Sequence, residues 1–345
     1  MNEQPRTVRE YAGVGTASFE PEIVASGEPA VMRGLVGDWP IVASARQSEQ
    51  ALCDYIAAFA PRQAVRFFRG DPAIGGRFFY NADFSGFNFE RSEAALEDLL
   101  RELLELRDAT EPPSIYAGAI PLRGELASLP AENPNPLLDA AIEQLVSLWI
   151  GNRGKTATHW DLPQNIACVV AGRRRFTLFP PEQLPNLYMG PLDFTLAGQP
   201  VSLVQPDDPD YGRFPRFREA MTSAQVAVLE PGDALYLPSM WFHHVESLDP
   251  LGVLVNFWWR DAEQHMFTPL FTLLHALLSI RDLPPREREI WRGMFDHYIF
   301  SGGDGTMEHL PESARGVCGE LTPERLVRLR AHLLHGLGGE PRRKR

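Results

Sequence analysis

The sequence has few cysteines, no long apolar run and a deficit of positive charge. Its three cysteines, Cys53, Cys168 and Cys318, show neither CxxC spacing nor the spacing of a disulfide framework, so we expect reduced, buried thiols. No apolar run approaches membrane-spanning length, and the N-terminal residues lack the apolar core of a signal peptide. These absences predict a cytoplasmic protein without a membrane partner.

Acidic residues dominate the charge. The 45 Asp and Glu residues outnumber the 33 Lys and Arg residues, which gives a formal net charge of −12. Binding to DNA or RNA needs a basic face, so this balance argues against a nucleic-acid partner, while it leaves room for a local basic pocket. The 345 residues, 44% of them hydrophobic, are enough to bury a substantial core.

Three regions with different patterns follow one another along the chain. Residues 1–110 read as an α/β segment packed on a central barrel, residues 111–262 as the β-rich barrel itself, and residues 263–345 as a helical region. The helical region ends in the basic tail 342–345, which we expect to be disordered. We find no internal repeat and no long low-complexity linker.

Local patterns predict the elements of the two outer regions. Ser92 is positioned to cap a helix over 93–107, whose leucines form an apolar stripe. The other elements expected outside the barrel are a helix over 48–60, short strands over 64–68 and 77–81, and C-terminal helices over 267–280, 285–300 and 323–336.

The central region is rich in short strands separated by turn signals, which is typical of a β-sandwich or barrel. Gly172 marks a tight hairpin, and Glu230-Pro231-Gly232-Asp233 has the residues of a type II turn. The candidate strands are 147–150, 156–161, 165–171, 174–180, 225–229, 234–238, 243–247 and 253–259.

The most informative motif is His159-Trp160-Asp161. On a strand, residues two apart point the same way, so His159 and Asp161 can face one metal together. His243, on a later strand, is our candidate third ligand; its neighbour His244 then faces the opposite side. Two His and one carboxylate form the facial triad that leaves Fe(II) open positions for a cosubstrate and O2.

Polar residues suited to a small dianion accompany the triad. Asn256 and Trp258 share a strand face, and Arg174 shares one with Phe176 and Leu178, so Arg174 is the inward member of the run Arg173-Arg174-Arg175. An inward guanidinium in an apolar barrel needs a carboxylate or phosphate partner. The remaining candidates of this group are Asn165, Thr156 and Tyr116.

Several of these segments resemble the core of the JmjC (cupin-like) Fe(II)/2-oxoglutarate oxygenases, and among them the asparaginyl hydroxylases. The resemblance spans roughly residues 20–262 in pattern and is specific from 147 to 259. It implies a mainly β fold, a double-stranded β-helix (jelly-roll or cupin) core with flanking helices and a C-terminal helical region. The segments that carry it are 156–161, Asn165, 172–181, 231–238, 241–247 and 255–258.

The resemblance also implies roles for single residues. His159, Asp161 and His243 would ligate Fe(II); Thr156 and Tyr116 would bind the distal carboxylate of 2-oxoglutarate. The family commonly places a Lys where this chain has Arg174, so Arg173 and Arg175 stay open as alternatives for that carboxylate. In addition, Thr156 is out of phase with His159 on a regular strand, which requires a bend or bulge near 157–158. Asn165 and Asn256 would lie near the metal-bound end of 2-oxoglutarate, and Trp258 would wall the site.

The implied reaction is hydroxylation of a C–H bond, coupled to conversion of 2-oxoglutarate and O2 into succinate and CO2. A protein or peptide side chain is the expected substrate, and a small molecule is an alternative. Residues 185–222 are expected to cover the mouth of the site. Two other functions stay open: N-methyl-lysine demethylation, and metal or ligand binding without redox turnover. The C-terminal helices are typical of a homodimer interface, with core burial or a partner-binding role as alternatives.

Overall fold

The structure is a computed structural model that describes residues 5–60, 62–139, 141–263, 265–301 and 306–338. The chain divides into two compact units, Met1–Ala262 and Glu263–Arg345. The predicted basic tail, 342–345, lies outside the described residues.

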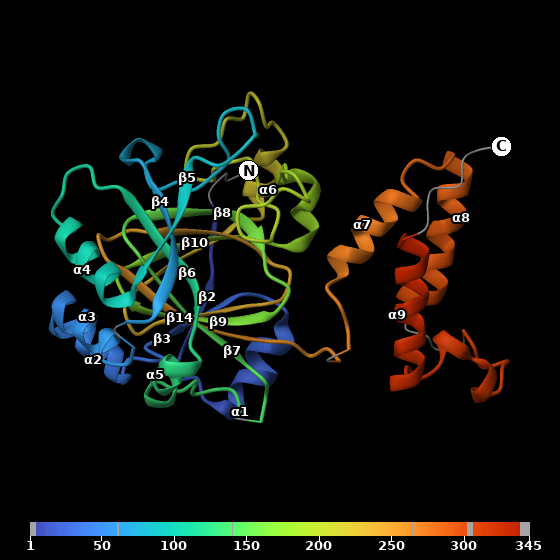
Figure 1. Cartoon of the computed structure of the whole chain (residues 1–345), viewed down its shortest axis with the longest axis horizontal. Helices are drawn as coiled ribbons and strands as arrows, with labels where there is room; N and C mark the ends of the chain where they lie inside the picture. Colours follow the sequence, from blue (N-terminus) through green and yellow to red (C-terminus); the bar gives the residue numbers. More distant parts are fainter. Residues whose placement is uncertain (1–4, 61, 140, 264, 302–305, 339–345) are drawn as a thin grey trace. The chain divides into compact units, whose positions relative to one another are not determined.

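Within the described residues, the first unit is built from two sheets (Figure 1). The larger sheet has the strand order β2 (Arg9–Ala12), β3 (Ala30–Arg33), β12 (Ala234–Leu237), β9 (Gln164–Ala171), β14 (Gly252–Trp259), β7 (Leu145–Gly151), β6 (Ser114–Pro121), β4 (Ala64–Gly70) and β5 (Phe89–Ala95). The smaller sheet has the order β1 (Arg6–Thr7), β11 (Gln225–Leu229), β10 (Arg174–Phe179), β13 (Phe242–Ser247) and β8 (Gly154–Trp160). Strands from the first 110 residues therefore pair into both sheets.

Strands β9, β12 and β14 of the larger sheet are buried along nearly their whole length, so both of their faces carry mainly apolar side chains. In β9, Ala167 and Val169 point into the barrel and pack with Phe176 and Leu178 of β10. The alternate residues of β9 point outward into a second core, which helices cover. Polar side chains that share the inner phase are therefore held inside the barrel. This mainly β core with flanking helices agrees with the fold that the sequence resemblance implies.

Helices cover the outer face of the larger sheet. The apolar stripe of α4 (Leu96, Leu99, Leu100, Leu103) is buried in the outer core, together with residues of α2 and α3. Figure 1 shows these three helices grouped on one side of the barrel. The α-helices of this unit are α1 (Thr16–Ser18), α2 (Pro40–Gln47), α3 (Glu49–Ala57), α4 (Leu96–Leu106), α5 (Ser128–Glu132) and α6 (Phe217–Thr222).

Two local predictions for the first 110 residues are wrong. Ser92 does not cap a helix: it lies within β5, opposite Phe67 of β4, and Ala95 precedes the first turn of α4. Pairing along the whole of β4 outweighs the capping preference of one serine. The expected strand over 77–81 forms only isolated bridges, Arg77 with Lys155 and Tyr80 with Phe87.

The predicted hairpin at Gly172 is also wrong. The strands on its two sides, β9 and β10, belong to different sheets, so Gly172 stands where the chain crosses from one sheet to the other. Its φ of 67° lies in the left-handed region, and a Cβ at this position would clash with the carbonyl oxygen of Leu251. Glycine is needed here for conformation and for space at once. By contrast, the turn at 230–233 is confirmed: Gly232 has a φ of 104°, and the Asp233 amide donates to Glu230 O.

We expect Gly172→Ala to lower the free energy of unfolding by about 2 kcal/mol or more, because strain at positive φ and the clash with Leu251 add together. Gly13 is a matched control, since its φ is 66° but a Cβ there would meet no atom within 4 Å. Urea denaturation of both variants would measure the difference. A cost for Gly172→Ala no larger than that for Gly13→Ala would contradict the prediction.

The second unit is helical in its described part, as the periodicity predicts. It contains α7 (Pro269–Ser279), α8 (Pro285–Phe295), a π-helical turn over Asp296–Phe300, and α9 (Pro323–Gly338). No helix in the described part of the chain is long and apolar enough to cross a bilayer. The prediction of buried cysteines holds for Cys53 and Cys168 but is wrong for Cys318, which is exposed in this unit.

Candidate metal and cosubstrate site

His159, Asp161 and His243 converge inside the barrel. Each offers one ligand atom, and the three atoms lie within 4.8 Å of one another. The Asp161 carboxylate stands between the two imidazoles: its oxygens are 4.0 Å from His159 Nε2 and 3.7 Å from His243 Nε2. Adjacent strands carry the two histidines, because His159 of β8 lies directly opposite His243 of β13. Three donors on one side of a common point are the arrangement of a facial triad.

Hydrogen bonds to backbone carbonyl oxygens orient both imidazoles. His159 Nδ1 lies 2.9 Å from Ala157 O, and His243 Nδ1 lies 3.1 Å from Trp241 O. Because a carbonyl oxygen only accepts, each Nδ1 carries the proton and each Nε2 keeps its lone pair for a metal. Burial, reinforced by the nearby His159, lowers the pKa of His243 to about 4, so this ring is neutral at pH 7.

The carboxylate ligand is tied to the connection between β12 and β13. The Met240 amide donates to Asp161 O at 2.9 Å, and Ser239 Oγ donates to Leu162 O at 2.6 Å. Met240 has a φ of 67°, which is strained for a residue with a side chain. These bonds hold the backbone of Asp161 just after β8 ends at Trp160.

A bulge in β8 brings Thr156 onto the face of His159. His243 and Val245 are two positions apart on β13, whereas their partners His159 and Thr156 are three positions apart on β8. The extra residue confirms the bulge predicted from the phase of Thr156. Thr156 then hydrogen-bonds to the hydroxyl of Tyr116, which comes from β6 of the larger sheet.

Arg174 is buried in the barrel with Tyr116 as its hydrogen-bond partner, and only 3% of its surface is exposed. In the described part of the chain its Nε and Nη2 have no partner, and no carboxylate pairs with it. Burial lowers its pKa from the ordinary value. Its neighbours face outward: Arg173 pairs with Asp249 at 2.9 Å, and Arg175 with Glu246 at 3.3 Å. Of the three arginines, Arg174 is therefore the one that can pair with an anion inside the barrel.

The remaining predicted residues border the same space. Asn165 and Asn256 are buried, and Trp258 is half-buried. Among the described residues, Asn165 Oδ1 and Trp258 Nε1 lack partners, while Asn256 Oδ1 accepts a hydrogen bond from Trp149 Nε1 at 2.8 Å. Sequence reasoning missed Trp149. Strand alternation could have found it, because Leu148 and Ile150 of β7 point outward.

All nine predicted site residues line one cavity of about 60 Å3, which we call the inner cavity. It shares six lining residues, among them His159, Asp161 and Tyr116, with an outer cavity of about 600 Å3. Leu196, Ala197, Gln199 and Val201 line the outer cavity, so part of the segment 185–222 does cover the mouth, as predicted. The end of that segment forms α6 in a separate cluster with Phe179.

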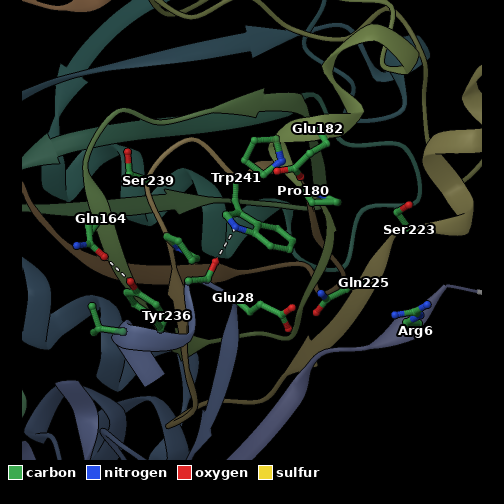
Figure 2. Close-up of a pocket in the computed structure, with 14 residues that line it drawn as sticks. Arg6, Glu28, Gln164, Pro180, Glu182, Ser223, Gln225, Tyr236, Ser239 and Trp241 are labelled. Atoms are coloured by element: carbon green, nitrogen blue, oxygen red, sulfur yellow. Dashed lines mark hydrogen bonds between the residues drawn. The ribbon is translucent and has the colours of Figure 1, made fainter. Parts of the chain in front are cut away.

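A third hollow, of about 670 Å3, lies at the connection between β12 and β13 (Figure 2). In Figure 2 the Trp241 indole donates to Gly27 O, and the Tyr236 hydroxyl donates to Gln164 Oε1. None of the nine predicted site residues lines this hollow. Its size alone does not make it the site, because the convergent donors lie in the inner cavity.

His244 faces the other side of β13, as predicted. It is 2% exposed, and its Nε2 lies 4.0 Å from an oxygen of Asp207. Burial lowers the pKa of His244 to about 4, against an opposing effect of Asp207. The His244 imidazole takes up its proton near pH 6.5 in the unfolded chain but only near pH 4 in the folded chain. Acidification between these two pH values therefore favours unfolding.

We therefore expect His244 to lower the free energy of unfolding by about 2 kcal/mol between pH 7 and pH 5. In His244→Gln this part of the pH dependence should disappear, whatever the variant's stability at pH 7. Urea denaturation of the metal-free protein at both pH values measures it. An identical pH dependence in wild type and variant would show that His244 does not contribute.

The atoms left without partners fit the groups that the sequence resemblance implies. The triad offers two neutral imidazoles and a carboxylate, which suits a first-row divalent metal. Arg174 offers unpartnered N–H donors that suit an anion, and Tyr116 and Thr156 add hydroxyls beside it. The residues present thus suit Fe(II) and a small dicarboxylate together.

Comparison with known proteins agrees with the fold. A model of the cupin-like domain family matches residues 16–265. The chain is 27% identical over 274 residues to lysine-specific demethylase JMJ31 of Arabidopsis thaliana, covering 71% of this chain and 48% of that protein. It is 29% identical over 207 residues to the human bifunctional peptidase and (3S)-lysyl hydroxylase JMJD7, covering 51% and 64%.

A third similar protein is tRNA wybutosine-synthesizing protein 5 of Gallus gallus, 36% identical over 149 residues, with 39% of this chain and 44% of that protein covered. The chain thus spans about half the length of JMJ31 and less than two thirds of each of the other two.

Proposed function

The chain belongs to the family of cupin-like domains of the JmjC type, and from this membership we propose that it is an Fe(II)- and 2-oxoglutarate-dependent dioxygenase that hydroxylates a C–H bond. One observation carries the proposal. The three candidate ligands and a buried guanidinium without an anionic partner line the same inner cavity, in the part of the chain that the structure describes. Metal binding alone does not require a buried guanidinium without an anionic partner, whereas binding of a dicarboxylate cosubstrate does.

The geometry supports a role for each of these residues. His159, Asp161 and His243 would hold the metal, and Arg174, Tyr116 and Thr156 would bind the distal carboxylate of 2-oxoglutarate. Asn165 and Asn256 would orient the other end, and Trp149 and Trp258 would exclude water. When bound, Fe(II) with 2-oxoglutarate supplies activation of O2, so that R–H, 2-oxoglutarate and O2 yield R–OH, succinate and CO2.

The test is succinate formation from 2-oxoglutarate by purified full-length protein under air, with and without Fe(II). We expect Fe(II)-dependent succinate and CO2 in equal amounts. Calorimetry with the Mn(II)-loaded protein provides a second readout, since 2-oxoglutarate should bind there without turnover. Absence of binding and of succinate together would favour the non-redox alternative.

The similar lysine-specific demethylase makes N-demethylation the second candidate. The two reactions differ in product mass, because hydroxylation adds one oxygen and demethylation removes a methylene group. Mass spectrometry of a trapped substrate separates them. For the substrate we propose a protein or peptide side chain, in keeping with the names of the similar lysyl hydroxylase and demethylase, with a small molecule as the alternative.

We also propose that the second unit forms a homodimer interface. Several of its large apolar side chains are exposed, including Phe271 at 65% and Leu278 at 80%. Burial of such a surface is the ordinary reason for association. Light scattering is expected to give twice the monomer mass of 38.7 kDa for the wild type, and the monomer mass for the double variant Leu278→Glu, Leu334→Glu. A monomeric wild type would contradict the proposal.

A further inference from the structure

An aromatic wall lines the path from the outer cavity to the metal ligands. Phe68 contacts Phe78 with ring centroids 5.9 Å apart, and Phe78 stacks on Tyr116 at 6.0 Å. The series continues through Trp149, 5.9 Å from Tyr116, to Trp258 at 5.8 Å. With Leu196 and Val201 opposite in the lining, the cavity favours an apolar group, preferably an aromatic ring.

The charges around this cavity are almost all positive. Among its described lining residues Asp161 is the single acid, and it stands between the two histidines of the triad. The cations are Arg66, Arg91 and Lys155. Lys155 is neutralised by Asp207 at 2.6 Å, and Arg66 lies 3.4 Å from Glu93. A cationic side chain would therefore enter the cavity without a free acid to pair with it.

Arg91 differs from the other two cations. Its guanidinium lies over the rings of Phe87 at 5.0 Å and of Phe68 and Phe89 at 5.6 Å each. One N–H donates to Leu196 O at 2.9 Å, which fixes the group against the segment over the mouth. No carboxylate of the described chain lies within ion-pair distance of it. Stacking and this hydrogen bond hold the remaining donors in place for an anion.

We propose that the substrate group bound here is apolar or aromatic and carries, or directly neighbours, a carboxylate or phosphate that pairs with Arg91. This inference rests on the proposed function, because it names the substrate class of the same site. It selects against a lysine-like cation. The anion can belong to a small organic acid or to an acidic residue of a peptide, and both sources present the same chemistry to the cavity.

Binding of matched probes tests the proposal. The full-length protein is loaded with Zn(II), which is redox-inert, and saturated with 2-oxoglutarate so that Arg174 is already occupied. The probes form two pairs: 4-phenylbutyrate with 4-phenylbutylamine, and capped Phe-Asp dipeptide with capped Phe-Lys dipeptide. Quenching of tryptophan fluorescence measures the binding of each probe. Each acid is expected to bind about 10-fold or more tightly than its basic counterpart. The tighter acid identifies the source of the anion.

Variants assign the preference to one residue. Arg91→Gln should weaken binding of the acids about 10-fold without weakening binding of the amines, and Arg91→Lys should restore part of the affinity for the acids. Arg66→Gln removes the same charge from a paired side chain that is 90% exposed, and should change affinity less than twofold. Equal binding of acids and amines, equal effects at both arginines, or no binding of any probe would overturn the proposal.

Failure of the proposed function gives a different result. The affinity for 2-oxoglutarate, measured separately by calorimetry, should be the same in wild type and Arg91→Gln. If 2-oxoglutarate did not bind at all, the proposed function would be contradicted. The relative affinities of the four probes for the zinc-loaded protein would still decide the substrate class.

Discussion

Asp161→Ala is expected to lower the affinity for Fe(II) by more than about a hundredfold and to reduce succinate formation to background. Loss of a direct ligand should exceed the 10- to 100-fold effect that outer-shell partners alone have on metal affinity. His159→Ala and His243→Ala should behave alike, since all three ligand atoms lie within 4.8 Å of one another. Metal content after dialysis and succinate release at limiting Fe(II) measure the effect.

Asp208→Ala is the matched control, because it removes an exposed carboxylate that lines neither the inner nor the outer cavity. It should retain wild-type metal content and turnover. Far-UV circular dichroism of each variant separates loss of the metal from loss of the fold. Fe(II)-dependent turnover at the wild-type rate in both Asp161→Ala and His159→Ala would contradict the assignment of the three metal ligands.

Arg174→Met is expected to weaken 2-oxoglutarate binding about 100-fold. Removing one partner of a buried charged pair costs about 2–5 kcal/mol, and methionine keeps most of the volume. In the absence of 2-oxoglutarate, the free energy of unfolding of Arg174→Met should equal or exceed that of the wild type. In that state Arg174 is a buried cation whose Nε and Nη2 have no partner in the described chain, and removing such a charge relieves its desolvation cost.

Arg173→Met and Arg175→Met are the controls, because both side chains pair with carboxylates on the outside of the barrel. Calorimetry measures the affinity for 2-oxoglutarate, and thermal unfolding measures stability. An unchanged affinity in Arg174→Met, with a loss in Arg175→Met, would transfer the role to Arg175.

The site was predictable from the sequence where strand alternation controls it. Arg174 follows the phase of Phe176 and Leu178, and Asn165 follows that of Ala167 and Val169, so their inward orientation needs only a period of two. Even the bulge beside Thr156 could be inferred, because no regular strand puts Thr156 and His159 on one face.

Other features could not be predicted because they depend on partners distant in the sequence. A glycine turn looks the same whether the next strand pairs with the last or crosses to another sheet, so Gly172 gave no sign of the crossing. Ser92 has the residue type of a helix cap, yet pairing with β4 makes it part of a strand. The sequence gives no indication of a role for Arg91, because its position beside the outer cavity depends on a hydrogen bond to Leu196, 105 residues away.

The hydrogen bonds from Met240 to Asp161 and from Ser239 to Leu162 would affect how the proposed metal binds. They make the carboxylate ligand and the strand that carries His243 parts of one rigid frame before any ion arrives. The entropy of ordering these ligands is lost on folding, not on metal capture. Under the proposed function, iron would bind to ligand positions that the fold has already ordered, so its loss and return would not require refolding of the chain.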